Sequence, residues 1–417
     1  MNAAHLAIWC ISLLSIAGIL IRPFRLPEYV WAVSGALLLL VTGLIRPSEG
    51  INGVLKGTDV YFFLIGMMLL SETAREVGVF DWLAVHATRW AKGSPGRLFF
   101  LVYGVGMLVT IFLSNDATAV VLTPAVAAAV RAAKVEKPLP YLLICAFIAN
   151  AASFVLPISN PANLVVYGAQ LPALLSWIPQ YILPSAVSIG ITFWMLRYTQ
   201  RQALKEPVHT DIPLLPLSAG GKMALAGIGC TAVVLLIVSA LHIPLGLPTT
   251  ITGVLTSAAV LARERVGPRQ VIRGISWSVL PLVAGLFVLV EALDKTGVLQ
   301  DAAGILHRYM AHSEKVAVWG SGVSVALLSN VLNNLPVGLM AGTVVQMGNV
   351  PAVIQRALLI GVDIGPNLSV TGSLATILWL LALRREGITI SGWTFLKIGA
   401  LVMTAALAGT LAVLCWG

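Results

Sequence analysis

The chain has 417 residues, of which 58% are hydrophobic and only 10% are charged, and its mean hydropathy is +0.92. Soluble globular domains carry about a quarter charged residues, so this composition excludes that class and indicates a polytopic membrane protein. The formal net charge of +9 would suit a nucleic-acid partner. However, the basic residues lie in short loops between apolar segments, where they orient a protein in the lipid bilayer, so we expect no nucleic-acid partner.

Ten apolar segments are long enough to cross a bilayer as helices, which takes about 20 residues. In chain order they are 4–21, 28–45, 57–76, 139–169, 176–198, 222–241, 246–262, 275–296, 351–384 and 393–416. Two further apolar segments, 97–132 and 315–347, are interrupted near their middles by polar residues. We predict that both form re-entrant hairpins, which enter and leave the membrane on one side. The predicted fold is therefore all-α, with ten transmembrane helices plus two re-entrant hairpins.

Loop charge predicts the orientation of these segments. If the N-terminus lies outside, the loops rich in Lys and Arg fall in the cytoplasm, as the positive-inside rule expects. The loops at 170–175, 242–245 and 348–350 then lie outside, and they carry no Lys or Arg. The loops at 46–56 and 295–315 are mixed. We expect a multi-pass protein of the cell inner membrane with both termini in the periplasm.

The two halves of the chain carry matching landmarks in the same order. Val54-Leu-Lys-Gly57 resembles Val271-Ile-Arg-Gly274, and Asn115-Asp116 aligns with Asn333-Asn334. Five spans in each half would insert the second copy upside down, an arrangement typical of secondary transporters. The predicted domains are a first inverted repeat at 1–201, a cytoplasmic linker at 202–221 and a second inverted repeat at 222–417.

Polar residues and prolines interrupt each repeat at two places. Ser114-Asn115-Asp116 forms the tip of the first hairpin, and such residues cap helix N-termini. Segment 139–169 breaks between Pro157 and Pro161, and segment 351–384 breaks at Gly365-Pro366-Asn367. Unwound backbone at membrane depth persists only where it is enclosed by protein or lines a wet cavity. A simple proline kink would explain one break, whereas four symmetric interruptions favour a central polar site.

Amide and hydroxyl side chains dominate this predicted site, and they offer both donors and acceptors. The candidate substrate-binding residues are Asn115, Asn150, Asn160, Asn163, Asn333, Asn334, Asn367, Ser373 and Thr376. The site contains no Lys or Arg, and a dicarboxylate or phosphate would be expected to need them. The pattern therefore favours a neutral hydrogen-bonding solute or a cation.

Two carboxyl groups, Asp116 and Asp363, accompany these amides. Desolvation favours the uncharged form of a carboxyl group, so each can take up and release a proton during a transport cycle. The alternative for Asp116 is a plain helix N-cap. Glu72 and Glu291 lie near segment ends, which favours anchoring or structural pairing. The four cysteines are scattered, so we expect no metal site and no cofactor, with the proton as coupling ion.

Three stretches, 112–124, Asn333-Asn-Leu-Pro336 and 361–379, together resemble the arsenite efflux permease family, ArsB, of the ion transporter superfamily. The resemblance covers nearly the whole chain. It implies a secondary transporter, not an enzyme, that exports trivalent arsenic (arsenite, as the neutral trihydroxide) and antimonite. It also implies either proton antiport or coupling to a soluble ArsA-type ATPase. Ala117 is a departure, because the family pattern places Gly after Asn-Asp at this tip.

Three other functions remain open at this stage. The first is a sodium/proton antiporter of the same superfamily, with the same carboxylates as cation ligands. The second is an intramembrane aspartyl protease, but that chemistry calls for Gly-x-Gly-Asp and Val362 precedes Asp363. The third is a passive channel.

Overall fold

The computed structural model describes residues 3–205, 208–209, 216–265, 267–348 and 350–416, and these residues form helices and no strands. Six of the described helices are long and apolar enough to cross a membrane, or seven if the bent pair α3 (Pro47–Lys56) and α4 (Thr58–Glu76) is one span. The six are α1 (Ala3–Ile21), α6 (Pro95–Phe112), α11 (Leu174–Thr199), α12 (Ala219–Ala240), α17 (Glu314–Leu332) and α21 (Gly392–Trp416). The all-α membrane fold is confirmed. The count of ten spans is not, because several expected spans are short, bent or broken.

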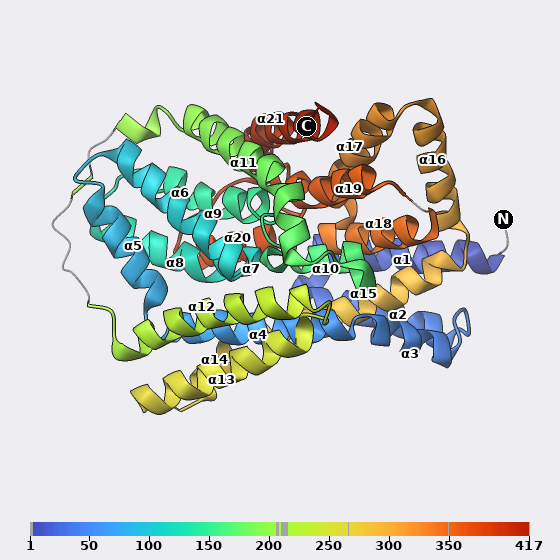
Figure 1. Cartoon of the computed structure of the whole chain (residues 1–417), viewed down its shortest axis with the longest axis horizontal. Helices are drawn as coiled ribbons and strands as arrows, with labels where there is room; N and C mark the ends of the chain where they lie inside the picture. The colour runs from blue at the N-terminus through green and yellow to red at the C-terminus, as the bar shows by residue number, and fades with distance from the viewer. Residues whose placement is uncertain (1–2, 206–207, 210–215, 266, 349, 417) are drawn as a thin grey trace.

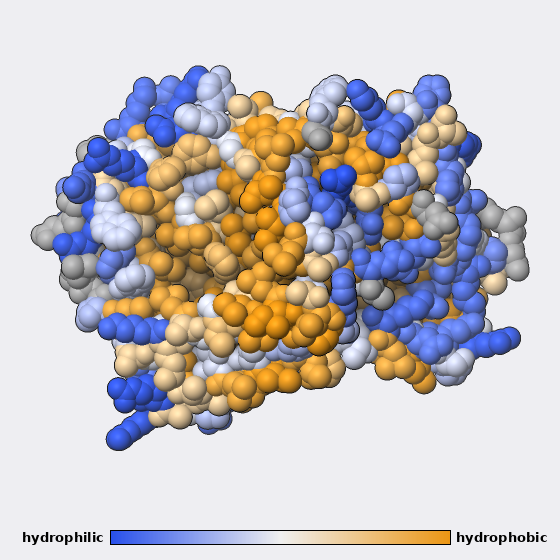
Figure 2. Space-filling view, viewed as in Figure 1, coloured by the Kyte–Doolittle hydropathy of each residue, from blue (hydrophilic) through white to orange (hydrophobic). Residues whose placement is uncertain are grey.

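The surface agrees with a protein that sits across a bilayer. Figure 2 shows apolar residues over the middle of one face and hydrophilic residues toward its left and right ends. Helix α13 (Gly246–Glu264) runs from the lower left of the view toward its middle (Figure 1). The apolar residues of this face therefore lie where a membrane would contact the helices.

The helices pack in two layers, seen one above the other in Figure 1. The lower layer holds α1, α2 (Glu28–Val41), α3, α4, α12, α13, α14 (Arg269–Gly274) and α15 (Val279–Asp294), with α4 packed on α13 and α2 on α15. In the upper layer α11 packs on α21 and α10 (Pro161–Tyr167) packs on α18 (Asn334–Gly348). This layer also holds α6, α7 (Asn115–Ala117), α8 (Thr123–Ala132), α9 (Leu139–Ala151), α17, α19 (Ala352–Ile364) and α20 (Leu374–Arg385). Each layer thus takes helices from both halves of the chain. The two halves of the chain therefore interleave in space. Their relation as two inverted repeats stays a prediction from the sequence.

Small residues allow the lower layer to pack closely. A Cβ atom on Gly66 of α4 would overlap the backbone of Thr249 on α13. About two helical turns further along, the hydroxyls of Thr73 and Ser257 are 2.7 Å apart and share a hydrogen bond. Close backbone approach and interhelical hydrogen bonds are the usual basis of helix association in membranes.

Two helices that the hydropathy pattern did not predict connect the layers. They are α5 (Val79–Trp90) and α16 (Val298–His312), which lie at opposite ends of the molecule in Figure 1. Each follows a glycine with positive φ, Gly78 or Gly297. Both are too short to span a bilayer and bury one apolar face, with Phe80 and Leu299 almost fully buried.

The chain reverses at both predicted tips. Helix α6 ends at Phe112, and α7 (Asn115–Ala117) begins after Ser114, whose hydroxyl accepts a hydrogen bond from the Ala117 amide at 3.2 Å. A π-helical turn at Thr118–Leu122 leads into α8 (Thr123–Ala132), and the Thr110 and Thr118 hydroxyls meet at 2.8 Å. At the second tip Asn333, with φ of 71°, separates α17 from α18. The re-entrant placement of 97–132 and 315–347 in a membrane stays a prediction.

The two predicted broken helices also divide. Helix α9 (Leu139–Ala151) is followed by an irregular segment and then α10, and α19 (Ala352–Ile364) is followed by another and then α20 (Leu374–Arg385). Asn160 and Ser373 cap the second half of each, accepting hydrogen bonds from Ala162 N and Thr376 N. Of the predicted linker 202–221, residues 206, 207 and 210–215 lie outside the described residues.

Candidate functional site

A small central cavity lies between the two layers, where the tips and the helix breaks meet. From the upper layer it is lined by five of the predicted site residues: Asn115, Asp116, Asn160, Asn334 and Ser373. Leu64 of α4 and Val279 of α15 face it from the lower layer. The volume open to the centre of a water molecule is about 10 Å³, which is enough for about one water. We call it the central cavity.

Asp116 is the charged group of the central cavity. It begins a helix, with its own amide donating to Asn115 Oδ1 at 2.9 Å. Among the described residues, none donates a hydrogen bond to its carboxyl group, although a helix N-terminus favours negative charge there. No Lys or Arg of the described residues lines the cavity. Asp116 is therefore available to bind a proton or a solute.

A second polar cluster holds the two helix breaks together. Asn150 Nδ2 donates to Asn367 Oδ1 at 3.0 Å and to Thr376 Oγ1 at 3.3 Å. Asn150 Oδ1 accepts from Ser373 Oγ at 3.2 Å, and Asn367 Nδ2 donates to Phe147 O at 3.1 Å. All of these side chains are buried. Asn150, Asn367 and Thr376 thus satisfy one another and position the breaks, and only Ser373 of this cluster also lines the central cavity.

We expect Asn150→Ala to destabilise the protein, because it orphans buried partners on Asn367, Thr376 and Ser373. Each orphaned buried group costs about 1–3 kcal/mol, so the thermal unfolding midpoint in detergent should fall clearly. Thr410→Val is the matched control, since within the described part of the chain the Thr410 hydroxyl bonds only to Ala406 O of its own helix. Equal midpoints for the two variants would contradict the positioning role.

Asp363 lies behind the central cavity and is completely buried. Its Oδ1 accepts a hydrogen bond from Asn160 Nδ2 at 2.7 Å, while its Oδ2 is buried and has no partner among the described residues. Asn160 therefore connects Asp363 to the cavity. An unpaired buried charge is costly, and an intramembrane carboxyl group with a free oxygen is a candidate functional group.

The two remaining predicted residues lie away from the cavity wall. Asn163 is buried and donates from Nδ2 to Ser153 O at 2.8 Å, which braces the first break, while its Oδ1 has no partner in the described part of the chain. Asn333 caps the second tip: its Oδ1 accepts from Leu335 N at 3.3 Å and its Nδ2 donates to Thr371 O at 3.4 Å.

Some polar residues near the site are not among the predicted substrate-binding or proton-coupling residues. Asn330 on α17 donates to Gly365 O at 2.9 Å and accepts from Ser369 Oγ at 2.7 Å, and so ties the second tip to the second break. Ser71, Glu72 and Ser114 line a neighbouring cavity that also contains Asp116. Asn330 lies among the polar residues that interrupt segment 315–347, and this position is the sequence feature that could have indicated its role.

A wide vestibule opens on the expected periplasmic side. Its volume open to water centres is about 570 Å³, and Lys56, Asp59 and Glu291 are among its lining residues. One helical turn separates it from the central cavity, because Val60 lines the vestibule and Leu64 the cavity, both on α4. On the other side, the cavity with Ser71 and Glu72 has a volume of only about 50 Å³. The described residues contain no group of three or more His, Cys, Asp or Glu that could hold a metal ion.

The chain is similar to known membrane transporters over almost its whole length. The family described as citrate transporter (CitMHS) matches residues 16–381. An arsenical pump membrane protein of Escherichia coli (strain K12) is 30% identical over 399 residues, which is 92% of each chain. The protein of the same name from Yersinia enterocolitica is 29% identical over the same shares. A putative arsenical pump membrane protein of Bacillus subtilis (strain 168) is 24% identical over 94% of each chain.

Two solved structures share the fold. The YdaH transporter of Alcanivorax borkumensis has a TM-score of 0.57 and 16% identity, covering 87% of this chain and 86% of that one. MtrF of Neisseria gonorrhoeae, from a class of antimetabolite efflux pumps, has a TM-score of 0.54 and 14% identity, covering 91% and 84%. At these identities the likeness concerns the arrangement of helices alone.

Proposed function

The chain belongs to the citrate transporter (CitMHS) family and to the family of arsenical pump membrane proteins, and from this membership we propose that it exports trivalent arsenic as a secondary transporter. The cargo in this proposal is arsenite as the neutral trihydroxide, with antimonite as a second cargo of the same chemistry. The location in this proposal is the cell inner membrane, with both termini in the periplasm.

The composition of the central cavity carries the choice of cargo. Asn115, Asn160, Asn334 and Ser373 present amide and hydroxyl groups, and no Lys or Arg accompanies them. Arsenic trihydroxide has three O–H donors and several lone pairs, which amides and hydroxyls match. Citrate carries several carboxylates and would call for cationic partners. The cavity therefore supports a neutral cargo over the one in the citrate transporter family's name.

The position of Asp116 supports the proposed exchange for protons. Its carboxyl group shares the cavity with the cargo, and Asp363 is connected to the same cavity through Asn160. Protonation changes the charge at the boundary between the layers, and so changes the relative stability of inward-facing and outward-facing states. In this proposal a proton enters from the vestibule side as arsenite leaves through it, and the cavity must widen beyond its present volume to admit the cargo.

Vesicles that contain purified protein and a trapped pH-sensitive dye test this proposal. Addition of arsenite or antimonite should produce a proton flux in the opposite direction, whereas sodium and citrate should produce none. Because no ATPase is present, a positive result also shows that an ArsA-type ATPase is not required. A proton flux with sodium that ignores arsenite would instead identify a sodium/proton antiporter.

A further inference from the structure

We propose that Glu72 is a proton relay, which takes the proton from Asp116 and passes it to the cytoplasm. The inference rests on the proposed proton antiport and adds a residue of the lower layer to it. The cavity that contains both carboxyl groups carries the argument. We call it the inner cavity, since loop charge predicts that it lies on the cytoplasmic side of Asp116.

The inner cavity joins the two layers. Its polar lining consists of Ser71, Glu72, Ser114, Asp116 and Ser276, and its volume open to water centres is about 50 Å³. That volume is several times the minimum for one water molecule. Water that fills it would contact both carboxyl groups, so a proton can pass between Asp116 and Glu72 without direct contact of the two side chains.

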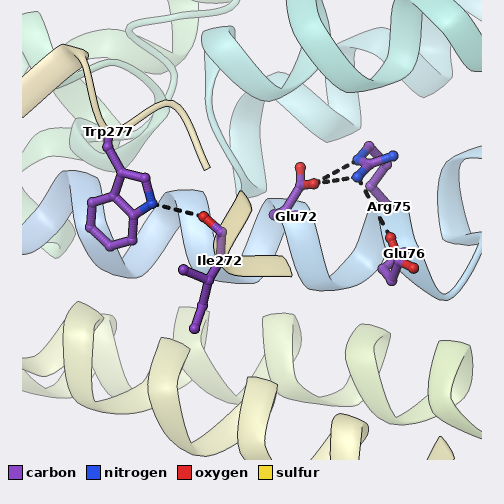
Figure 3. Close-up of polar contacts among 5 residues, drawn as sticks. All are labelled: Glu72, Arg75, Glu76, Ile272 and Trp277. Carbon is purple, nitrogen blue, oxygen red and sulfur yellow. Dashed lines mark hydrogen bonds and ion pairs between the residues drawn. The ribbon is translucent and has the colours of Figure 1, made fainter. Parts of the chain in front are cut away.

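Glu72 is held so that one of its oxygens stays available. The residue is only 6% exposed, and its Oε1 accepts hydrogen bonds from Nε of Arg75, at 2.9 Å, and from Nη2. Figure 3 shows both bonds, with the second carboxylate oxygen directed away from Arg75 and free of drawn bonds. Arg75 also approaches Glu76 at 3.6 Å, and 44% of the Arg75 side chain is exposed. Arg75 therefore links the buried Glu72 to the protein surface.

The opposite wall of the inner cavity is shaped around this carboxylate. A Cβ atom on Gly274 would overlap the Glu72 carboxylate, so glycine at this position lets α14 pack against the acid. The turn after Gly274 is fixed by Trp277, whose Nε1 donates to Ile272 O at 2.8 Å (Figure 3).

Ser71 supplies a polar group that ordered water would satisfy. Its Oγ is buried and has no partner among the described residues, although the side chain lines the inner cavity. Buried hydroxyls are normally hydrogen-bonded, so a water molecule in the cavity is the natural partner. The unpaired Ser71 hydroxyl is therefore a second indication, separate from the two carboxyl groups, that water fills the inner cavity.

Few charged groups surround Glu72. Arg75 faces it from its own helix and Asp116 from across the inner cavity. Helix α14 contributes Gly274, and α13 contacts the next residue, Thr73, through the Ser257 hydroxyl. On α5, Asp81 interacts with Arg75. The π-helical turn contributes Val120 and Val121, and α10 contributes Pro161, all uncharged. Asp116 is therefore the proton donor that the cavity offers to Glu72.

The relay consists of two proton transfers. A protonated Asp116 gives its proton through cavity water to the Glu72 carboxylate, which leaves Asp116 charged and Glu72 neutral. Glu72 then releases the proton to cytoplasmic water beside Arg75 and regains its ion pair. The alternative is that Glu72 and Arg75 form an ion pair with a structural role only. Lys56 and Glu291 form such a pair on the vestibule side, with Nζ and Oε2 2.6 Å apart.

Glu72→Gln separates the two roles, with Glu76→Gln as control. Glu76 lies on the same helix and approaches the same arginine, but it does not line the inner cavity. In vesicles, exchange of labelled arsenite for arsenite needs no net proton movement, whereas gradient-driven export does. We expect Glu72→Gln to keep exchange within about twofold and to slow proton-coupled export roughly tenfold or more, the effect of removing a positioned proton carrier. Glu72→Asp should restore part of the coupled rate, and Glu76→Gln should leave both rates unchanged.

A second variant keeps the acid but moves it. Gly274→Ala should displace the Glu72 carboxylate and slow coupled export while exchange continues. If Glu72→Gln and Gly274→Ala slow exchange and coupled export equally, together with a lower unfolding midpoint, the ion pair is structural and the relay is wrong. Coupled export at the parent rate in Glu72→Gln would also overturn the relay. Absence of coupling in the parent protein would instead refute the proposed antiport.

Discussion

Asp116→Asn is expected to raise the arsenic content of arsenite-treated cells to the level of cells that lack the transporter. The substitution keeps the size and polarity of the side chain and leaves the backbone bond to Asn115 in place. It removes the one titratable group that, among the described residues, lines the central cavity. Without a proton to exchange, the variant can only equalise the arsenite concentrations on the two sides of the membrane. In the parent, a pH difference of one unit stores about 1.4 kcal/mol per proton, which supports roughly a tenfold ratio of arsenite concentrations.

Asp301→Asn is the matched control for this experiment, because Asp301 is an exposed carboxyl group on α16 that does not line the central cavity. It should protect a sensitive host as well as the parent does, at equal expression. Resistance that survives in Asp116→Asn would remove Asp116 from the coupling mechanism.

Asp363→Asn is expected to keep the fold and lose gradient-driven export. The amide oxygen of the new side chain can still accept the hydrogen bond from Asn160 Nδ2, so the break remains supported. The buried Oδ2, which has no partner in the described residues, becomes an NH₂ group that cannot take up a proton. The unfolding midpoint should stay near that of the parent, while pH-driven efflux from vesicles falls to the rate without a gradient.

Asp363→Ala distinguishes support from proton coupling at this position. It leaves the buried Asn160 amide without its acceptor and should cost about 1–3 kcal/mol of stability. A lower midpoint in both variants, with coupling intact in Asp363→Asn, would make Asp363 a structural acceptor only.

The interruptions of the helices were predictable because local chemistry determines them. Ser114 caps a new helix, and Pro161 and Pro366 lack the amide that a continuous helix needs. The all-α membrane fold likewise follows from composition. Ser, Asn, Gly and Pro within apolar segments therefore located the polar centre before any tertiary contact was known.

The partners of each side chain were not predictable in the same way. An amide such as Asn150 has the same sequence signature whether it faces a cavity or another amide, and only packing shows that it bonds to Asn367. The interleaving of the two halves also depends on close approaches such as Gly66 against Thr249. The helices α5 and α16 were not predicted because each is shorter than the run of about 20 apolar residues that marks a membrane span.

Steady-state accumulation of arsenite in vesicles at a series of imposed pH differences tests proton-coupled export most directly. Exchange of one proton for each neutral arsenite moves one net charge. With the membrane potential held at zero, it therefore predicts a concentration ratio that rises about tenfold for each pH unit and disappears when a protonophore collapses the gradient. An arsenite ratio that stays at unity across the whole series, with the protein folded and correctly inserted, would contradict it.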